Sequence, residues 1–240
     1  MIKELIKRAL KYSGIALTKN QRYDQQTEQI FKNKLKASSN CIDVGCHQGE
    51  ILDLMMTYAP EGLHFGLEPI PEFYHALEKK YKNFDSCTIL NYAASNEKGL
   101  SSFNYVVSNP AYSGLRKRDY DQAGEEDMSI EVQTERLDVL IPGNIEIDLI
   151  KIDVEGAELL VLEGARKLIK KHQPLVIFEH GLGASDHYGT GPQEIFQYFS
   201  EQKMFVNTMR GFLKKSAPFT QDRFQSEYYQ KRNYYFIAFP

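Results

Sequence analysis

The sequence predicts an α/β fold: a mainly parallel seven-stranded sheet with an antiparallel edge strand and helices on both faces. Two observations predict it. Short apolar runs alternate along the chain with segments whose apolar residues recur at helical spacing, as in successive βαβ units. A hairpin-like pair of strands ends the chain, which fits an antiparallel strand at one edge. The predicted strands are residues 41–44, 64–67, 87–90, 147–152, 175–178, 205–209 and 234–239.

The first two strands each end in a signal for a turn and a helix. Residues 41–44 are followed by two glycines, Gly45 and Gly49, and then by a helical stripe of apolar residues. The strand at 64–67 leads into a helix that we expect to start near Pro71, because proline favours the first turn of a helix. These segments predict two successive βα units.

The middle and end of the chain extend this pattern. Residues 101–133 are polar and contain several glycines, so we interpret them as an insertion with edge strands and a lid-like loop. Residues 147–152 are nearly all apolar, as expected of a central strand that is buried on both faces. A helix at about 192–202 then separates the strands at 175–178 and 205–209.

Length and composition indicate an ordinary globular protein. The chain has 240 residues, of which 42% are apolar and 25% charged, and we expect a helical segment at 1–35 before one domain at 36–240. The net charge of −3 argues against nucleic acid as a partner. The three cysteines lack a close CxxC pair and are expected to be reduced core thiols. The sequence does not indicate an oligomeric state.

Residues 1–12 have apolar side chains at helical spacing opposite four basic residues. The pattern favours a helix that packs on its own domain, with peripheral contact to a membrane surface as the alternative. No apolar run approaches the roughly 18 residues that a membrane-spanning helix requires, and basic residues interrupt any signal-peptide core. We therefore expect a cytoplasmic protein without a transmembrane segment.

Residues at the ends of the predicted strands indicate a ligand that contains adenosine. Ligands of open α/β sheets bind beyond the carboxyl ends of the strands. Gly45 and Gly49 allow a sharp turn and a close approach there, and Glu68 follows where a carboxylate can accept both hydroxyls of a ribose. The glycine spacing is not the GxGxxG of a dinucleotide site, and Asp43 would repel a pyrophosphate but suits a cationic sulfonium amino acid.

Small residues follow the third strand, where Ala93 and Ala94 lie beside polar residues that could bind the edge of an adenine. An ordinary exit from a strand into a loop explains this segment equally well when it is taken alone. The expected cofactor-binding residues are Asp43, Gly45, Cys46, His47, Gly49, Glu68, Pro69, Ala93, Ala94 and Asp153.

Carboxylates crowd the end of the strand at 147–152. Asp153 and Glu155 share one face if the strand continues. There they could bind the amino group of the ligand, orient a substrate hydroxyl or, together with Glu179, hold a Mg²⁺-like ion. Glu158 alone is better explained as a negative charge at a helix N-terminus.

The strand at 175–178 ends in a carboxylate beside an imidazole, Glu179 and His180. An imidazole is the natural general base near neutral pH. His180 is therefore the candidate base, with Glu179 or Glu155 orienting it or the substrate, and Asp153 completes the candidate catalytic set. A structural histidine in the core is the alternative.

Four motifs together resemble the FkbM family of S-adenosylmethionine-dependent methyltransferases. They are DVGCHQG at 43–49, GLEP at 66–69, AASN at 93–96 and DLIKIDVEGAE at 148–158. The similarity extends over about residues 40–180, and the last motif is the most specific. The family usually has alanine where this chain has Cys46, a change that leaves the glycine turn intact.

The resemblance implies a Rossmann-like class I methyltransferase fold over residues 36–240, with S-adenosylmethionine as the cofactor. It places Asp43 and the two glycines beside the methionine part of the cofactor, Glu68 beside the ribose, and the two alanines near the adenine. The implied reaction is O-methylation of a sugar, a glycan or a natural-product hydroxyl, so the expected partner is a small-molecule or saccharide acceptor. An NAD-dependent dehydrogenase and a non-catalytic ligand-binding module of the same fold are the alternatives.

Overall fold

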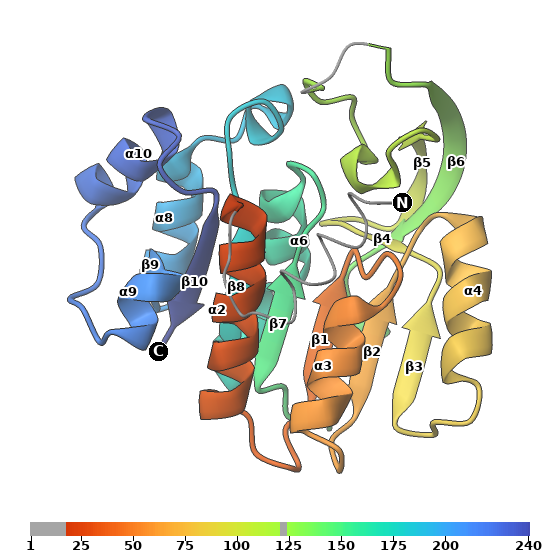
Figure 1. The fold of residues 1–240 in the computed structure, drawn as a ribbon, viewed down its shortest axis with the longest axis horizontal. Helices are drawn as coiled ribbons and strands as arrows, with labels where there is room; N and C mark the ends of the chain where they lie inside the picture. Colours follow the sequence, from red (N-terminus) through yellow and green to blue (C-terminus); the bar gives the residue numbers. More distant parts are fainter. Residues whose placement is uncertain (1–17, 121–123) are drawn as a thin grey trace, which may run out of the picture.

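Seven strands form the central sheet of the computed structural model, which describes residues 18–120 and 124–240. Their spatial order is β3-β2-β1-β7-β8-β10-β9 (Figure 1). All seven strands predicted from the sequence are confirmed, and the largest difference in bounds is that β7 begins at Leu149 rather than at residue 147. Their bounds are β1 Cys41–Val44, β2 His64–Leu67, β3 Cys87–Leu90, β7 Leu149–Ile152, β8 Leu175–Glu179, β9 Phe205–Thr208 and β10 Tyr235–Phe239.

The last strand of the chain, β10, is antiparallel to both of its neighbours, β8 and β9, whereas the strands from β3 to β8 pair in parallel. The antiparallel strand therefore lies one place in from the edge, and β9 is the edge strand. In this register Tyr235 pairs with Glu179 of β8. The pairing brings residues near the C-terminus to the end of a central strand.

Helices cover both faces of the sheet, and a buried apolar cluster fills each face. Alternation along the strands separates the two clusters: Ile42 and Val44 of β1 belong to one, and Cys41 belongs to the other. The first cluster packs against α5 Leu137–Leu140, α6 Glu158–Gly164, α7 Arg166–His172, α8 Pro192–Glu201 and α10 Gln221–Tyr229. The second packs against α2 Lys19–Lys34, α3 Glu50–Tyr58, α4 Pro71–Tyr81 and α9 Met209–Leu213.

Helix α2 starts at a capping box, in which Thr18 and Gln21 exchange hydrogen bonds between side chain and backbone. Its buried face includes Tyr23, Ile30 and Phe31, and it packs against α3 and α9. The amphipathic helix predicted at 1–12 lies outside the described residues.

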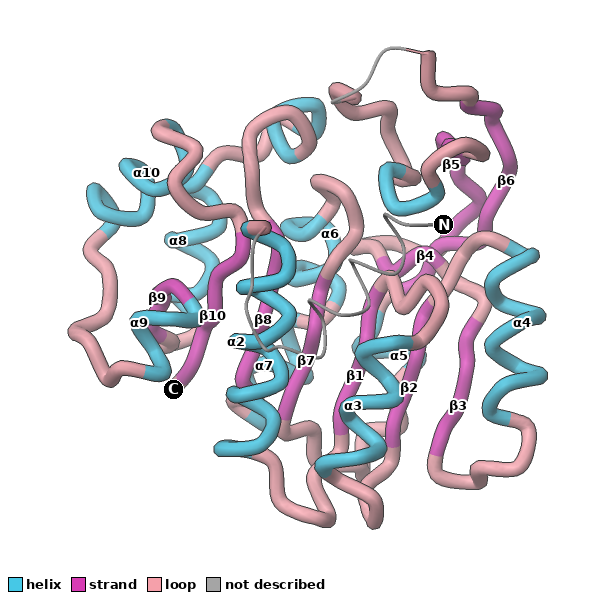
Figure 2. Tube along the Cα trace, in the orientation of Figure 1, coloured by secondary structure: helices cyan, strands magenta, loops and turns pink. Residues whose placement is uncertain are grey.

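The residues that follow β3 form a second sheet of three strands, in the order β4-β6-β5. Its strands are β4 Ala93–Ala94, β5 Gly99–Val106 and β6 Asp127–Glu135, and the short helix η1 Pro110–Tyr112 follows β5. The insertion predicted at 101–133 thus contains strands, but they build a sheet of their own instead of extending the main one. This sheet lies beyond the carboxyl ends of the central strands (Figure 2). No helix among the described residues is long and apolar enough to cross a membrane.

Candidate active site

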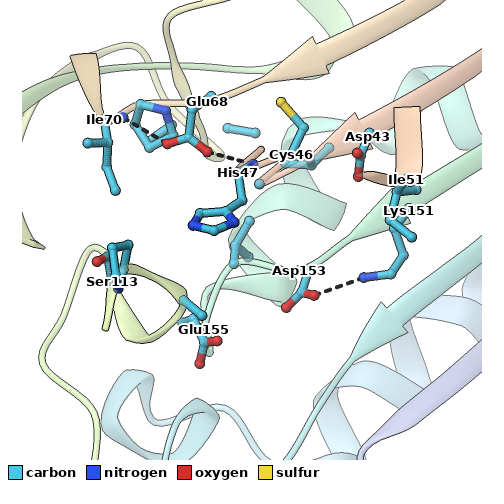
Figure 3. A pocket seen from close by; sticks show the side chains of 18 of the residues that line it. Asp43, Cys46, His47, Ile51, Glu68, Ile70, Ser113, Lys151, Asp153 and Glu155 are labelled. Carbon is cyan, nitrogen blue, oxygen red and sulfur yellow. Dashed lines mark hydrogen bonds and ion pairs between the residues drawn. The ribbon is translucent and has the colours of Figure 1, made fainter. Parts of the chain in front are cut away.

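A cavity of about 270 Å³, here called the first pocket, opens at the carboxyl ends of β1, β2 and β7 (Figure 3). The turns after these strands form its floor, β4 and the residues after β5 form a second wall, and Tyr23, Asp24 and Thr27 of α2 close a third side. Open α/β sheets bind their ligands at this position.

Two glycines shape the turn between β1 and α3. Gly45 and Gly49 have φ angles of +80° and +78°, in the left-handed region that glycine adopts without strain. A Cβ atom on Gly45 would lie 2.0 Å from the carbonyl oxygen of Asp153, and one on Gly49 would lie 2.5 Å from the Tyr81 hydroxyl. The turn predicted from the sequence therefore requires both glycines, and the packing of the chain against itself requires them even without a bound ligand.

Asp43 lines the floor of the first pocket with only 2% of its surface exposed. Its Oδ2 atom has no hydrogen-bond partner among the described residues. Burial raises the pKa of Asp43 to about 7, although the nearby Lys151 ammonium opposes this effect. A buried acceptor without a partner is costly. Asp43 is therefore suited to receive a donor, above all a cationic one, from a bound ligand.

Glu68, just after β2, is held by backbone amides on both carboxylate oxygens. Oε2 accepts a hydrogen bond from the His47 amide at 2.8 Å, and Oε1 accepts one from the Ile70 amide at 2.9 Å. Burial raises the pKa of Glu68 to about 7, and the two amide hydrogen bonds oppose the rise. Each carboxylate oxygen can accept more than one hydrogen bond. Glu68 is thus fixed in place and can still bind paired hydroxyls.

Apolar side chains form the wall of the first pocket that belongs to the second sheet. Ala93 and Ala94 of β4 are buried there, and Ile70, Phe103 and Leu115 lie around them. The parallel pairing of β4 with β6 fixes the two alanines in place. Small and flat side chains leave a slot that suits a planar ring.

A second pocket of about 420 Å³ lies beside the first and shares the lining residues Ala111, Asp153, Glu155 and Tyr235 with it. Its remaining walls combine aromatic rings with polar groups, among them Asn20, Tyr112, Glu179, Tyr228, Asn233 and Tyr234. The two pockets therefore meet at a wall that carries two carboxylates and one phenol.

Two neighbouring side chains hold Asp153 in this shared wall. Its Oδ2 atom accepts a hydrogen bond from Lys151 at 3.0 Å and another from the Tyr235 hydroxyl. Burial raises the pKa of Asp153, but Lys151, Glu179 and Tyr235 outweigh burial and hold it at about 2. Burial and the Asp153 charge together raise the pKa of Glu179 well above its ordinary value. The pKa values of these two neighbouring carboxyl groups are therefore shifted in opposite directions, down for Asp153 and up for Glu179.

Glu155 lies in a left-handed turn after β7, with φ of +56°. The next residue, Gly156, has φ of +107°, and a Cβ atom there would lie 2.6 Å from the Ala184 carbonyl oxygen. Glu158 holds the turn from inside, because its Oε1 atom accepts a hydrogen bond from the Gly156 amide at 2.9 Å. The turn directs Glu155 toward the insertion, where the Arg118 guanidinium contacts its carboxylate.

The structure does not bring His180 to either pocket. Its side chain is fully buried, with ring centroids 4.8 Å from Tyr228 and 6.1 Å from Phe224. Within the described part of the chain, neither ring nitrogen has a hydrogen-bond partner that meets the usual distance and angle limits. Burial lowers the pKa of His180 to about 3, although the Gly191 backbone opposes this effect. Neighbouring side chains of an extended chain point to opposite sides, so Glu179 reaches the second pocket and His180 points away from it.

Most of the other residues predicted from the sequence converge. The first pocket is lined by Asp43, Gly45, Cys46, His47, Glu68, Pro69, Ala93, Ala94, Asp153 and Glu155. Gly49 does not line the pocket and forms the N-cap of α3. Carboxylate oxygens of the three acids in the metal hypothesis, Asp153, Glu155 and Glu179, lie within 4.8 Å of one another.

Tyr235, Lys151 and the α2 residues of the first pocket were not predicted from the sequence. Lys151 was detectable, because it lies two residues before Asp153 in a strand and so shares its face. Tyr235 is found only once β10 is paired with β8. Nothing in the local sequence of α2 indicates that Tyr23 and Thr27 reach the site.

The geometry of the site does not by itself identify the protein family, but a comparison of the sequence with protein families does. Residues 43–206 match the methyltransferase FkbM domain. The chain belongs to the FkbM methyltransferase family. The matched region begins at Asp43 and includes the strand ends that form the floor of the first pocket. No curated protein sequence matches this chain closely enough to be counted as a relative.

Solved structures resemble the fold of this FkbM protein. The FkbM methyltransferase from Methylobacillus flagellatus KT has a TM-score of 0.52 and 15% sequence identity to it. That similarity covers 86% of this chain but 44% of the other, so this chain spans less than half the length of that protein. Precorrin-6y C5,15-methyltransferase from Geobacter metallireducens GS-15 aligns over 80% of this chain and 76% of its own, with a TM-score of 0.44 and 12% identity. The first similarity supports the Rossmann-like class I methyltransferase fold.

The first pocket fits S-adenosylmethionine, the cofactor that the family implies. The free oxygen of Asp43 matches an ammonium group, the fixed carboxylate of Glu68 matches ribose hydroxyls, and the alanine slot matches an adenine. These groups all line the same cavity.

Proposed function

We propose that this FkbM protein transfers the methyl group of S-adenosylmethionine to a hydroxyl oxygen of a sugar, glycan or natural-product acceptor. The observation that carries the proposal is the shared wall between the two pockets. A cavity with groups that suit the cofactor opens directly beside a polar and aromatic cavity, and Asp153 borders both. Methyl transfer requires an acceptor oxygen held close to the methyl carbon and in line with the bond that breaks.

The residues of the first pocket act by binding and positioning. S-adenosylmethionine, when bound, supplies an electrophilic methyl group on a sulfonium centre. Asp43 accepts from the amino group with its free oxygen, Glu68 accepts from the ribose, and Ala93 and Ala94 pack against the adenine. Thr27 and Tyr23 of α2 help to shield this pocket from water.

Asp153 replaces His180 in our assignment of the group that accepts the proton. Its carboxylate is ionised at neutral pH, and Lys151 and Tyr235 hold one of its oxygens. The acceptor oxygen forms its bond to the methyl carbon while the bond to sulfur breaks, and the hydroxyl proton passes to Asp153. A weakly basic carboxylate suits a proton transfer that follows the start of bond formation, when the acceptor oxygen has become strongly acidic.

The second pocket supports a hydroxylated organic acceptor. The aromatic lining of this pocket can pack against the C–H groups of a sugar or a polyketide ring, and the side chains of Asn20 and Asn233 can bind its hydroxyls. The net charge of −3 gives the chain no overall attraction for a nucleic acid backbone. A small-molecule or saccharide partner and a cytoplasmic location remain predictions.

The first experiment tests cofactor binding. S-adenosylhomocysteine should raise the melting temperature of the wild-type protein, since a ligand that binds only the native state stabilises it. Glu68→Gln should weaken this shift, whereas the control Glu97→Gln, at an exposed position outside both pockets, should leave it unchanged. A shift with NAD in place of S-adenosylhomocysteine would support the dehydrogenase alternative instead.

The second experiment tests transfer. Incubation with S-adenosylmethionine that carries a labelled methyl group, against a panel of sugars and hydroxylated natural products, should yield a methyl ether. Asp153→Asn should then lower kcat by about 100-fold, the lower end of the range for loss of an acid–base group, while S-adenosylhomocysteine still binds. Retained binding with no acceptor methylated across the panel would favour the non-catalytic module.

A further inference from the structure

The carboxylate cluster of the shared wall has the geometry of a divalent cation site. One oxygen from each of Asp153, Glu155 and Glu179 lies within 4.8 Å of the others, and hard cations such as Mg²⁺ and Mn²⁺ prefer such oxygen ligands. Three acids this close repel one another unless cations or protons offset their charge. The nature of the offsetting charge therefore decides whether a metal ion is needed.

Each carboxylate of the cluster already has a partner from the chain itself. The Arg118 guanidinium contacts Glu155, and the side chains of this pair are only 14% and 12% exposed. Lys151 lies 3.0 Å from Asp153. The Glu179 side chain interacts with that of Asp153. Arg118 and Lys151 thus supply positive charge where a metal ion would otherwise supply it.

Arg118 is held in this position by its surroundings. Its guanidinium lies over the Tyr112 ring at 4.7 Å, and that ring stacks on Tyr120 with an interplanar angle of 6°. The next residue in the chain, Asp119, donates its backbone N–H to the Gly183 carbonyl at 2.8 Å. The insertion is therefore fastened to the loop after β8, and Arg118 is directed inward.

We propose that Arg118 is a built-in counter-ion that takes the place of a divalent cation among Asp153, Glu155 and Glu179. A guanidinium offers several N–H donors in a fixed plane, and it keeps its positive charge throughout the accessible pH range. Arg118 therefore offsets the negative charge of the cluster permanently, whereas a metal ion could dissociate and rebind. The proposal follows from the cluster alone and goes beyond methyl transfer, so it can be tested without an acceptor.

The test is the binding of Mn²⁺, measured by electron paramagnetic resonance and by isothermal titration calorimetry. The variant Arg118→Met removes the charge and keeps an unbranched side chain. The matched control Arg116→Met removes a guanidinium from the same loop. That guanidinium donates to the His187 carbonyl oxygen and forms no ion pair with a carboxylate of the described residues. Thermal melting of each variant verifies that it is folded.

We expect the wild-type protein and Arg116→Met to show no stoichiometric Mn²⁺ site. Arg118→Met should bind one Mn²⁺ at least about tenfold more tightly than the wild-type protein does, because the positive charge that repels the ion has been removed. Adding Asp153→Asn to Arg118→Met should abolish this site. Stoichiometric binding by the wild-type protein that Glu179→Gln removes would overturn the proposal. Equal and weak binding by the wild type and a folded Arg118→Met would overturn it as well.

Discussion

The affinity for S-adenosylhomocysteine should rise as the pH increases from 6 to 8, because two carboxyl groups of the first pocket must lose protons to bind it. Burial raises the pKa of both Asp43 and Glu68 to about 7. The ligand offers an ammonium group and two hydroxyls, which are donors and favour the ionised carboxylates. Binding therefore lowers both pKa values and releases protons to solution.

The size of the effect follows from the two pKa values. A carboxyl group with a pKa of about 7 is roughly 10% ionised at pH 6 and roughly 90% ionised at pH 8. One such group therefore changes the dissociation constant about tenfold over this interval, and two independent groups change it by nearly 100-fold. The pKa of each group is raised in the free protein, so the affinity increases as the pH passes through 7 and levels off above 8.

Isothermal titration calorimetry at pH 6, 7 and 8, in two buffers with different ionisation enthalpies, gives both the affinity and the number of protons released. Glu68→Gln cannot ionise at this position, so it should reduce the change to the roughly tenfold contribution of Asp43. The exposed Glu97→Gln should keep the full change. A dissociation constant that stays the same from pH 6 to 8, with no release of protons, would refute the reasoning.

Three further predictions concern residues around the pockets. His180→Leu should leave kcat within about threefold, because the imidazole reaches neither pocket, and a folded variant that has lost about 100-fold would restore the histidine base. Gly45→Ala should lower the free energy of unfolding by about 3 kcal/mol or more, since its Cβ atom would meet the Asp153 carbonyl, and an unchanged urea midpoint would contradict this. Glu158→Gln should gain stability relative to wild type between pH 5 and 8. Burial raises the pKa of Glu158 from 4.5 to about 7, so protonated Glu158 stabilises the native state and the wild-type protein loses this stability as the pH rises from 4.5 through 7. Equal differences in melting temperature between the variant and the wild-type protein at pH 5 and 8 would count against this prediction.

The strands and most of the first pocket were predictable because their signals are local. An apolar run followed by a glycine turn or an acid marks the carboxyl end of a strand, and Asp43 and Glu68 both occur at such ends. His180 was misplaced because its position next to Glu179 was taken to mean a shared direction. Side chains alternate along an extended chain, so only one of the two can face the pockets.

The rest of the site depends on contacts between segments that are remote in sequence. Tyr235 reaches Asp153 because β10 enters the sheet beside β8, and Arg118 reaches Glu155 because the insertion folds back over the strand ends. Neither residue is part of a recognisable local motif. The metal hypothesis depends on such contacts too, because the sequence predicts that the three acids lie together but does not show which side-chain cations lie beside them.

The position of β10 affects how shortened forms of this protein can be designed. The region that matches the family ends at residue 206, inside β9, so a fragment cut there would appear to keep the whole domain. It would lack β10, however, and the side of β8 that pairs with β10 would be left without a partner. It would also lose Tyr235, which borders both pockets. Expression trials and domain fusions should therefore retain the residues through Phe239, whatever the boundary of the sequence match suggests.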